Sequence, residues 1–128
     1  MISLPHPVRV FFHTPATDLR KGFDALSGLV TTAFAQDPTS GHLFLFVNRR
    51  RDRLKILYWD RDGLAIWYKR LETGSFQLPV VVRDAVSIEM SPTQLTLILS
   101  GIDLSSARQR KRYQRPTPEV EKSIGPLL

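Results

Sequence analysis

Three apolar, strand-like segments follow one another between residues 42 and 71, and only short polar links separate them. The segments read HLFLFVN (42–48), RLKILYW (53–59) and LAIWYKRL (64–71), with RRRD and DRDG between them. A link of four residues is too short for the crossover that joins parallel strands, so these neighbours must pair antiparallel, as hairpins. The sequence therefore predicts a β-meander at the centre of the fold.

The first hairpin has a predictable register. A tight turn at 49–52 places Phe46 opposite Lys55 and Leu45 opposite Ile56. Because side chains alternate between the two faces of a sheet, one face is then aliphatic and the other is aromatic with a basic rim. The aromatic face carries Phe44, Phe46 and Trp59.

The second hairpin leaves its register open. A three-residue loop through Gly63, with this glycine at positive φ, would add Trp67 and Lys69 to the aromatic face. Ile66 and Tyr68 would then join the aliphatic face. A slip of one residue would exchange these assignments, because each residue shift turns a side chain to the opposite face.

A short strand and a helix are predicted both before and after the meander in the sequence. Residues 7–13 favour a strand, and apolar residues then recur with helical spacing over about 18–34 (Leu19, Phe23, Leu26, Val30 and Ala33). Residues 36–41 are typical of a loop. A short strand at 85–90 precedes the capping box Ser91-Pro92-Thr93-Gln94, which predicts a helix over 92–100. We expect an α+β fold: an antiparallel meander, with the N-terminal helix packed on one face and a short second helix. The first strand should pair within the same sheet, in an order that the sequence leaves open.

Charge divides the chain into two parts. Residues 1–103 hold 12 basic and 10 acidic side chains, so residues 104–128 contribute four of the net +6. This last segment has three prolines and almost no large apolar side chains before Ile124, so we expect one domain at 1–103 and a flexible basic tail at 104–128. The tail cations are Arg108, Arg110, Lys111, Arg112 and Arg115.

The sequence shows neither a secretory signal nor an apolar run of the roughly 20 residues that span a bilayer. We therefore expect a cytoplasmic protein without membrane contact. Cysteine is absent, which excludes disulfides, thiolate zinc sites and iron–sulfur clusters. No glycine-rich phosphate loop is present either, and we expect no cofactor.

The basic residues of the meander suggest a nucleic-acid contact. Three consecutive arginines occupy a hairpin tip, where guanidinium groups can reach phosphates without burial. The alternative for the hairpin tip is a solvated turn with no ligand. The tail cations suit non-specific nucleic-acid binding and a purely solubilising tail equally well. The candidate phosphate contacts are Arg49, Arg50, Arg51, Arg53, Lys55, Arg61, Lys69 and Arg70, with Arg108, Arg110, Lys111 and Arg112 from the tail.

The aromatic face offers a second hypothesis. Phe44, Phe46, Trp59 and Trp67 could form an exposed apolar patch that docks a protein partner or a second copy of the chain. The alternative is that this face is a second buried layer, covered by the helix at 92–100.

Catalysis is the third and weakest hypothesis. Two-metal phosphoryl transfer needs several carboxylates that converge, and Asp18, Asp60 and Asp62 are the available set. Asp60 and Asp62 sit in a hairpin link, where aspartate is favoured for turn geometry, and Asp18 suits a helix cap. His6, His13 and His42 lack metal-ligand or triad spacing. We therefore expect no catalytic and no metal-ligating residues.

Three segments carry a family resemblance: TDLRKGFDAL (17–26), the long block from 37 to 76, and SPTQLTLILSGID (91–103). Together they resemble the small accessory protein, often labelled TnpB, of the insertion-sequence-66 family of bacterial transposable elements. The unrelated RNA-guided nucleases of the same label are much longer and have cysteine-rich modules, which this chain lacks.

The resemblance implies a non-catalytic protein encoded beside a larger transposase, whose transposition it assists. Two modes of action stay open. The protein binds nucleic acid, DNA rather than RNA by expectation, through its basic hairpin, or it is an adaptor that docks the transposase or a sister accessory protein.

Overall fold

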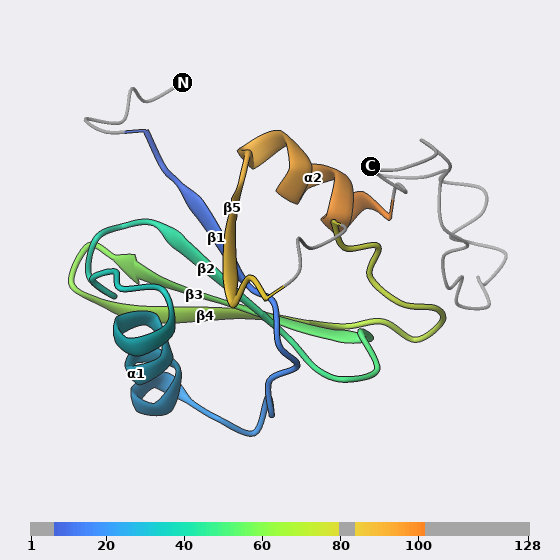
Figure 1. Ribbon diagram of the computed structural model, residues 1–128, viewed down its shortest axis with the longest axis horizontal. Helices are drawn as coiled ribbons and strands as arrows, with labels where there is room; N and C mark the ends of the chain where they lie inside the picture. Colours follow the sequence, from blue (N-terminus) through green and yellow to red (C-terminus); the bar gives the residue numbers. More distant parts are fainter. Residues whose placement is uncertain (1–6, 80–83, 102–128) are drawn as a thin grey trace, which may run out of the picture.

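The computed structural model describes residues 7–79 and 84–101, which form a five-stranded sheet and two helices (Figure 1). No helix in these ranges is long and apolar enough to cross a membrane. The elements are β1 (Val10–His13), α1 (Phe23–Ala33), β2 (Leu43–Val47), β3 (Arg53–Asp60), β4 (Gly63–Arg70), β5 (Ser87–Met90) and α2 (Pro92–Ser100).

The predicted meander is present, but the sheet as a whole is mixed. The strand order is β4-β3-β2-β1-β5, and β2, β3 and β4 pair antiparallel as consecutive hairpins. Phe46 pairs with Lys55 and Leu45 with Ile56, which confirms the predicted register. β1 joins the same sheet, as expected, and its place there, which the sequence left open, is between β2 and β5, parallel to β2. The segment containing α1 supplies the long crossover that parallel pairing requires.

The second hairpin takes the alternative register. Asp60 pairs with Gly63, so the turn contains only Arg61 and Asp62. The positive φ falls on Arg61, at +57°, and not on Gly63, which corrects the three-residue loop expected from the sequence. Ile66 consequently lies opposite Leu57, while Trp67 lies opposite Ile56 on the other face of the sheet.

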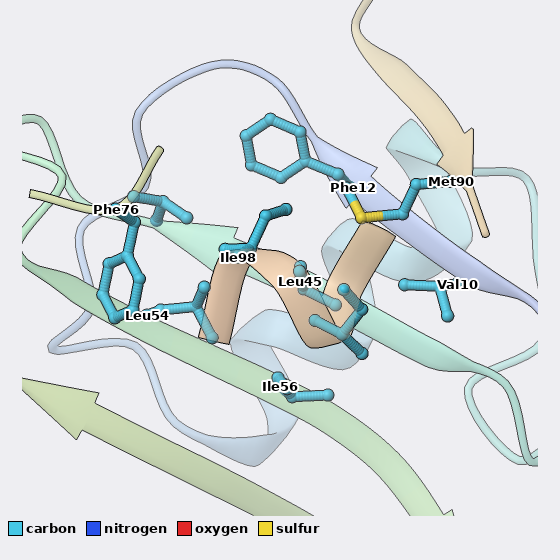
Figure 2. Close-up of a cluster of buried hydrophobic side chains, with 10 residues drawn as sticks. Val10, Phe12, Leu45, Leu54, Ile56, Phe76, Met90 and Ile98 are labelled. Atoms are coloured by element: carbon cyan, nitrogen blue, oxygen red, sulfur yellow. The ribbon is translucent and has the colours of Figure 1, made fainter. Parts of the chain in front are cut away.

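Each face of the sheet has its own buried cluster and its own helix, and Figure 1 shows α1 and α2 on opposite sides of the strands. On one face, Leu45, Leu54 and Ile56 pack with Leu95 and Ile98 of α2 (Figure 2). On the other, Phe44, Phe46 and Leu57 pack with Leu26 and Val30 of α1, and with Phe34 just after it. Apolar burial on both faces makes the sheet the central layer of the domain.

The aromatic face is therefore a core layer and not a docking surface. Phe44 and Phe46 are fully buried, with ring centroids 5.4 and 5.9 Å from that of Phe34. The cover on this face is α1, whereas the sequence had suggested the helix at 92–100. Trp59 is half-buried on the same face, and Trp67 is on the opposite face, so the four aromatics do not form one surface.

The two helices differ in how closely the sequence predicts their ends. α2 has the predicted bounds: Ser91 and Gln94 form both hydrogen bonds of the capping box, and Gly101 ends the helix in the left-handed conformation. α1 begins at Phe23 and not at Asp18. The Asp18 carboxylate instead accepts hydrogen bonds from the backbone and side chain of Arg20, and Gly22 is extended, so the chain reaches α1 through a separate turn.

Candidate nucleic-acid interface

The tip of the β2–β3 hairpin is organised by a single side chain, that of Asn48. Its Oδ1 accepts the N–H groups of Asp52 (3.1 Å) and Arg53 (3.0 Å), and its Nδ2 donates to the Asp52 carboxylate at 2.6 Å. Its backbone carbonyl accepts the N–H of Arg51 at 3.0 Å. Asparagine at the start of a tight turn is typical of such bonding, and it holds the loop in one conformation.

The segment after β4 also binds the tip. Leu71 N–H donates to the Asp52 carbonyl, and Phe76 N–H donates to the Arg51 carbonyl, both at 2.7 Å. Phe76 itself is buried in the cluster beneath α2, so the tip is linked to the core. The arginines of the tip therefore extend from an ordered backbone, which reduces the conformational entropy lost when they bind a ligand.

Arg49, Arg50 and Arg51 are exposed at this tip, and their side chains form no ion pair with a described residue. Three other described arginines are ion-paired: Arg9 with Glu89 at 2.6 Å, Arg20 with Asp18 at 2.7 Å and Arg70 with Glu72 at 2.9 Å. The tip thus concentrates three positive charges that no described carboxylate neutralises. Exposed guanidinium groups of this kind bind phosphate oxygens in pairs.

A groove of about 520 Å³ lies beside the tip. One wall is the loop before α1, and the other consists of the tip and the end of β4. The loop is attached to the hairpin by a 2.8 Å hydrogen bond from Thr17 N–H to the Val47 carbonyl. The groove is lined by Ala16, Thr17, Asp18, Leu19, Arg20, Asn48, Arg49, Arg50, Asp52, Arg53 and Tyr68.

The other predicted cations of the meander do not all belong to this site. Arg53 is exposed beside the groove, with its Nη1 3.5 Å from the Tyr68 hydroxyl. Arg70 pairs across the sheet with Arg53 and is bound to Glu72. Lys69 is half-buried on the α2 face and has an interaction of its own. Arg61 is in the opposite turn, about 23 Å away along the eight-residue β3.

The predicted phosphate contact at Lys55 is wrong, because this side chain is buried and not available to a phosphate. Only 9% of its surface is exposed. Its Nζ donates to the Lys21 carbonyl at 3.0 Å and lies 4.9 Å from the centroid of the Tyr68 ring. The ammonium is thus satisfied inside the protein, where it fastens the loop before α1 to the sheet.

The carboxylates of the catalytic hypothesis do not converge. Asp18 borders the groove, whereas Asp60 and Asp62 are at the opposite turn. Hydrogen bonds from the Arg20 side chain and backbone lower the pKa of Asp18 well below its usual value. Within the ranges 7–79 and 84–101, no three His, Cys, Asp or Glu side chains are placed to hold a metal ion.

Sequence reasoning missed Tyr68, Asn48 and Arg20 as parts of the site. Asn48 before RRRD was a readable turn signal. Tyr68 required the correct register of the second hairpin, and Arg20 required knowledge of the loop before α1. The predicted tail contacts, Arg108, Arg110, Lys111 and Arg112, lie outside the described residues.

Comparison with known proteins places the chain in a family. Residues 8–109 match the family described as IS66 Orf2 like protein. Two similar proteins are the uncharacterized proteins y4jC and y4hO of Sinorhizobium fredii (strain NBRC 101917 / NGR234), 37% and 38% identical over 117 residues. Each alignment covers 91% of this chain and 97% of the relative. No solved structure matches. The resemblance predicted from the sequence is confirmed: the chain belongs to the IS66 Orf2-like family, a membership that indicates an accessory protein of an insertion sequence.

Proposed function

We propose that this protein is a non-catalytic accessory factor that assists transposition in the cytoplasm by binding DNA of its element through the hairpin tip. The observation that carries the proposal is the set of three exposed arginines, Arg49 to Arg51, which form no ion pair with a described residue and lie on a loop ordered by Asn48 beside a groove. Phosphate binding by such groups requires no metal and no reacting carboxylate. The remaining net charge of the chain adds attraction to a polyanion.

Salt dependence is the direct test of this proposal. Each phosphate contact changes the slope of log K against log salt by about −0.9 for duplex DNA and about −0.7 for a single strand. Replacing Arg49, Arg50 and Arg51 with alanine should therefore make the slope shallower by roughly 2–3. We would measure it by fluorescence anisotropy, using the full chain, the terminal DNA of the element and a shuffled sequence.

A charge-matched variant distinguishes the contribution of the hairpin tip to DNA affinity from that of the tail cations. Replacing Arg108, Arg110 and Lys111 with alanine removes the same formal charge from a different part of the chain. We expect both variants to lower affinity for terminal and shuffled DNA alike, because phosphate contacts do not distinguish sequences. The tip variant should lose more affinity than the tail variant, because its arginines extend from an ordered loop. Equal effects of the two variants, or no effect of the tip variant, would contradict the proposed interface.

A protein-docking role is the second candidate, and the edge of the sheet favours it. β4 is an edge strand in the described sheet, and Trp67 on it is 39% exposed. An edge strand offers unpaired backbone groups to a partner strand, either from the transposase, a sister accessory protein or a second copy. Co-purification with the transposase that persists at high salt and is lost in Trp67→Ala would support this role over DNA binding.

A further inference from the structure

We propose that the groove beside the hairpin tip binds one nucleotide of a single DNA strand, with its base stacked on Tyr68 and its phosphate on Arg49 and Arg50. This inference rests on the proposed function, since it specifies which form of nucleic acid the tip recognises. Duplex DNA presents its phosphates but keeps its bases stacked on one another, so only an unpaired base can use an aromatic ring.

Tyr68 has the properties of a stacking platform. It is 47% exposed, although it is a large aromatic residue in the body of a strand. Its ring is restrained from one side by Lys55, whose Nζ is 4.9 Å from the ring centroid, and its hydroxyl is 3.5 Å from Arg53 Nη1. A ring held in this way loses little conformational freedom when a base stacks on its open side.

The groove places this ring and the tip arginines on one cavity. Tyr68, Arg49 and Arg50 all line it, and its volume of about 520 Å³ lies within the range of small-ligand sites, about 300–1,000 Å³. A base on the tyrosine and a phosphate on the arginines would therefore belong to the same nucleotide or to adjacent ones. This combination of an aromatic ring with adjacent cations is how sequence-tolerant single-strand binding sites work.

The two carboxylates in the groove wall do not oppose an anion as strongly as their number suggests. Asp18 forms a paired hydrogen bond with the Arg20 guanidinium, and Asp52 accepts from Asn48 Nδ2 at 2.6 Å. The hydroxyl of Thr17, a buried residue in the same wall, has no hydrogen-bond partner among the described residues.

The test compares single-stranded and duplex forms of one sequence, by anisotropy with the full chain. Tyr68→Leu removes the aromatic ring, Tyr68→Phe keeps it, and Trp67→Leu removes the neighbouring exposed aromatic from the opposite face of the sheet. We expect the parent protein to bind the single strand more tightly than the duplex. Tyr68→Leu should lower its affinity for the single strand by roughly 5- to 100-fold. Tyr68→Phe and Trp67→Leu should change single-strand affinity by no more than about twofold, since both variants keep an aromatic ring at position 68.

A cross-linking measurement on the unaltered protein does not depend on variants that fold. A single strand containing 5-iodouracil should cross-link to Tyr68 on irradiation, located by mass spectrometry of the peptides. Cross-linking to Trp59 or Trp67 instead, or an unchanged single-strand affinity in Tyr68→Leu, would overturn the inference. If this inference fails but alanine at Arg49, Arg50 and Arg51 still weakens duplex binding, the proposed function stands without the single-strand site. If the protein binds neither single-stranded nor duplex DNA, the proposed function and this inference are both wrong.

Discussion

Lys55 provides the sharpest test of how the site is built, because the sequence predicts a phosphate contact where the structure has a buried structural cation. The informative change is Lys55→Met, which keeps an unbranched side chain of similar length and removes the ammonium. It should lower stability and leave the groove's arginines in place. The structure therefore predicts an effect on folding, with an effect on duplex binding by the tip arginines only through the unfolded fraction.

The expected magnitude follows from the two interactions of the ammonium. A hydrogen bond from a charged donor, here to the Lys21 carbonyl at 3.0 Å, contributes about 1.5–3 kcal/mol. The cation–π contact with Tyr68 adds about 0.5–2 kcal/mol. Methionine has no charge to desolvate on burial, which offsets part of the two losses, so we expect a net loss of about 1–3 kcal/mol.

Urea denaturation followed by circular dichroism measures this loss in the free energy of unfolding. The matched control is Lys21→Met, which removes the same charge from an exposed side chain and should change stability by less than about 0.5 kcal/mol. The reasoning would be refuted if Lys55→Met were as stable as the parent while its DNA affinity fell as far as that of the tip variant. Lys55 would then be a phosphate contact.

Four further predictions concern capping, charge, turn geometry and the opposite turn. Ser91→Ala should destabilise the protein by about 0.5–2 kcal/mol in urea, since it removes the N-cap of α2, and no change would contradict the capping box. Asp18→Asn should raise DNA affinity at low salt, because it removes a negative charge from the groove wall and frees Arg20; an unchanged or lower affinity in anisotropy would count against the groove. Gly63→Ala should stabilise by about 0.4–1 kcal/mol, because Gly63 does not have positive φ and an added Cβ would meet nothing within 4 Å. Arg61→Ala should leave the salt slope unchanged within about 0.3, since this arginine is in the opposite turn, and a drop of about 0.7–0.9 would make it a phosphate contact.

Local signals predicted the elements whose geometry is local. The four-residue link RRRD fixed the first hairpin, and the capping box with Pro92 and Gly101 fixed both ends of α2. The predicted register of the second hairpin is wrong because the link DRDG permits both a two-residue and a three-residue turn. Packing of Ile66 against the α1 cluster selects the two-residue turn. The parallel pairing of β1 depends on where α1 packs, which no local pattern encodes.

The candidate site shows the same division. The position of Arg49, Arg50 and Arg51 at an exposed hairpin tip follows from the first hairpin alone and is confirmed, while their role stays a prediction. Alternation assigned Lys55 to the aromatic face, but whether that face is covered depends on α1 and the loop before it. Tyr68 reached the groove only through the register that the sequence left open.

The most direct measurement of the central claim is a titration of the isotopically labelled full chain with the element's terminal DNA, observed by NMR of backbone amides and arginine Nε–H groups. We predict the largest shifts at Asn48 to Arg53 and at the Nε–H groups of Arg49, Arg50 and Arg51. Shifts confined to residues 104–128, with the tip unchanged at saturation, would contradict the account.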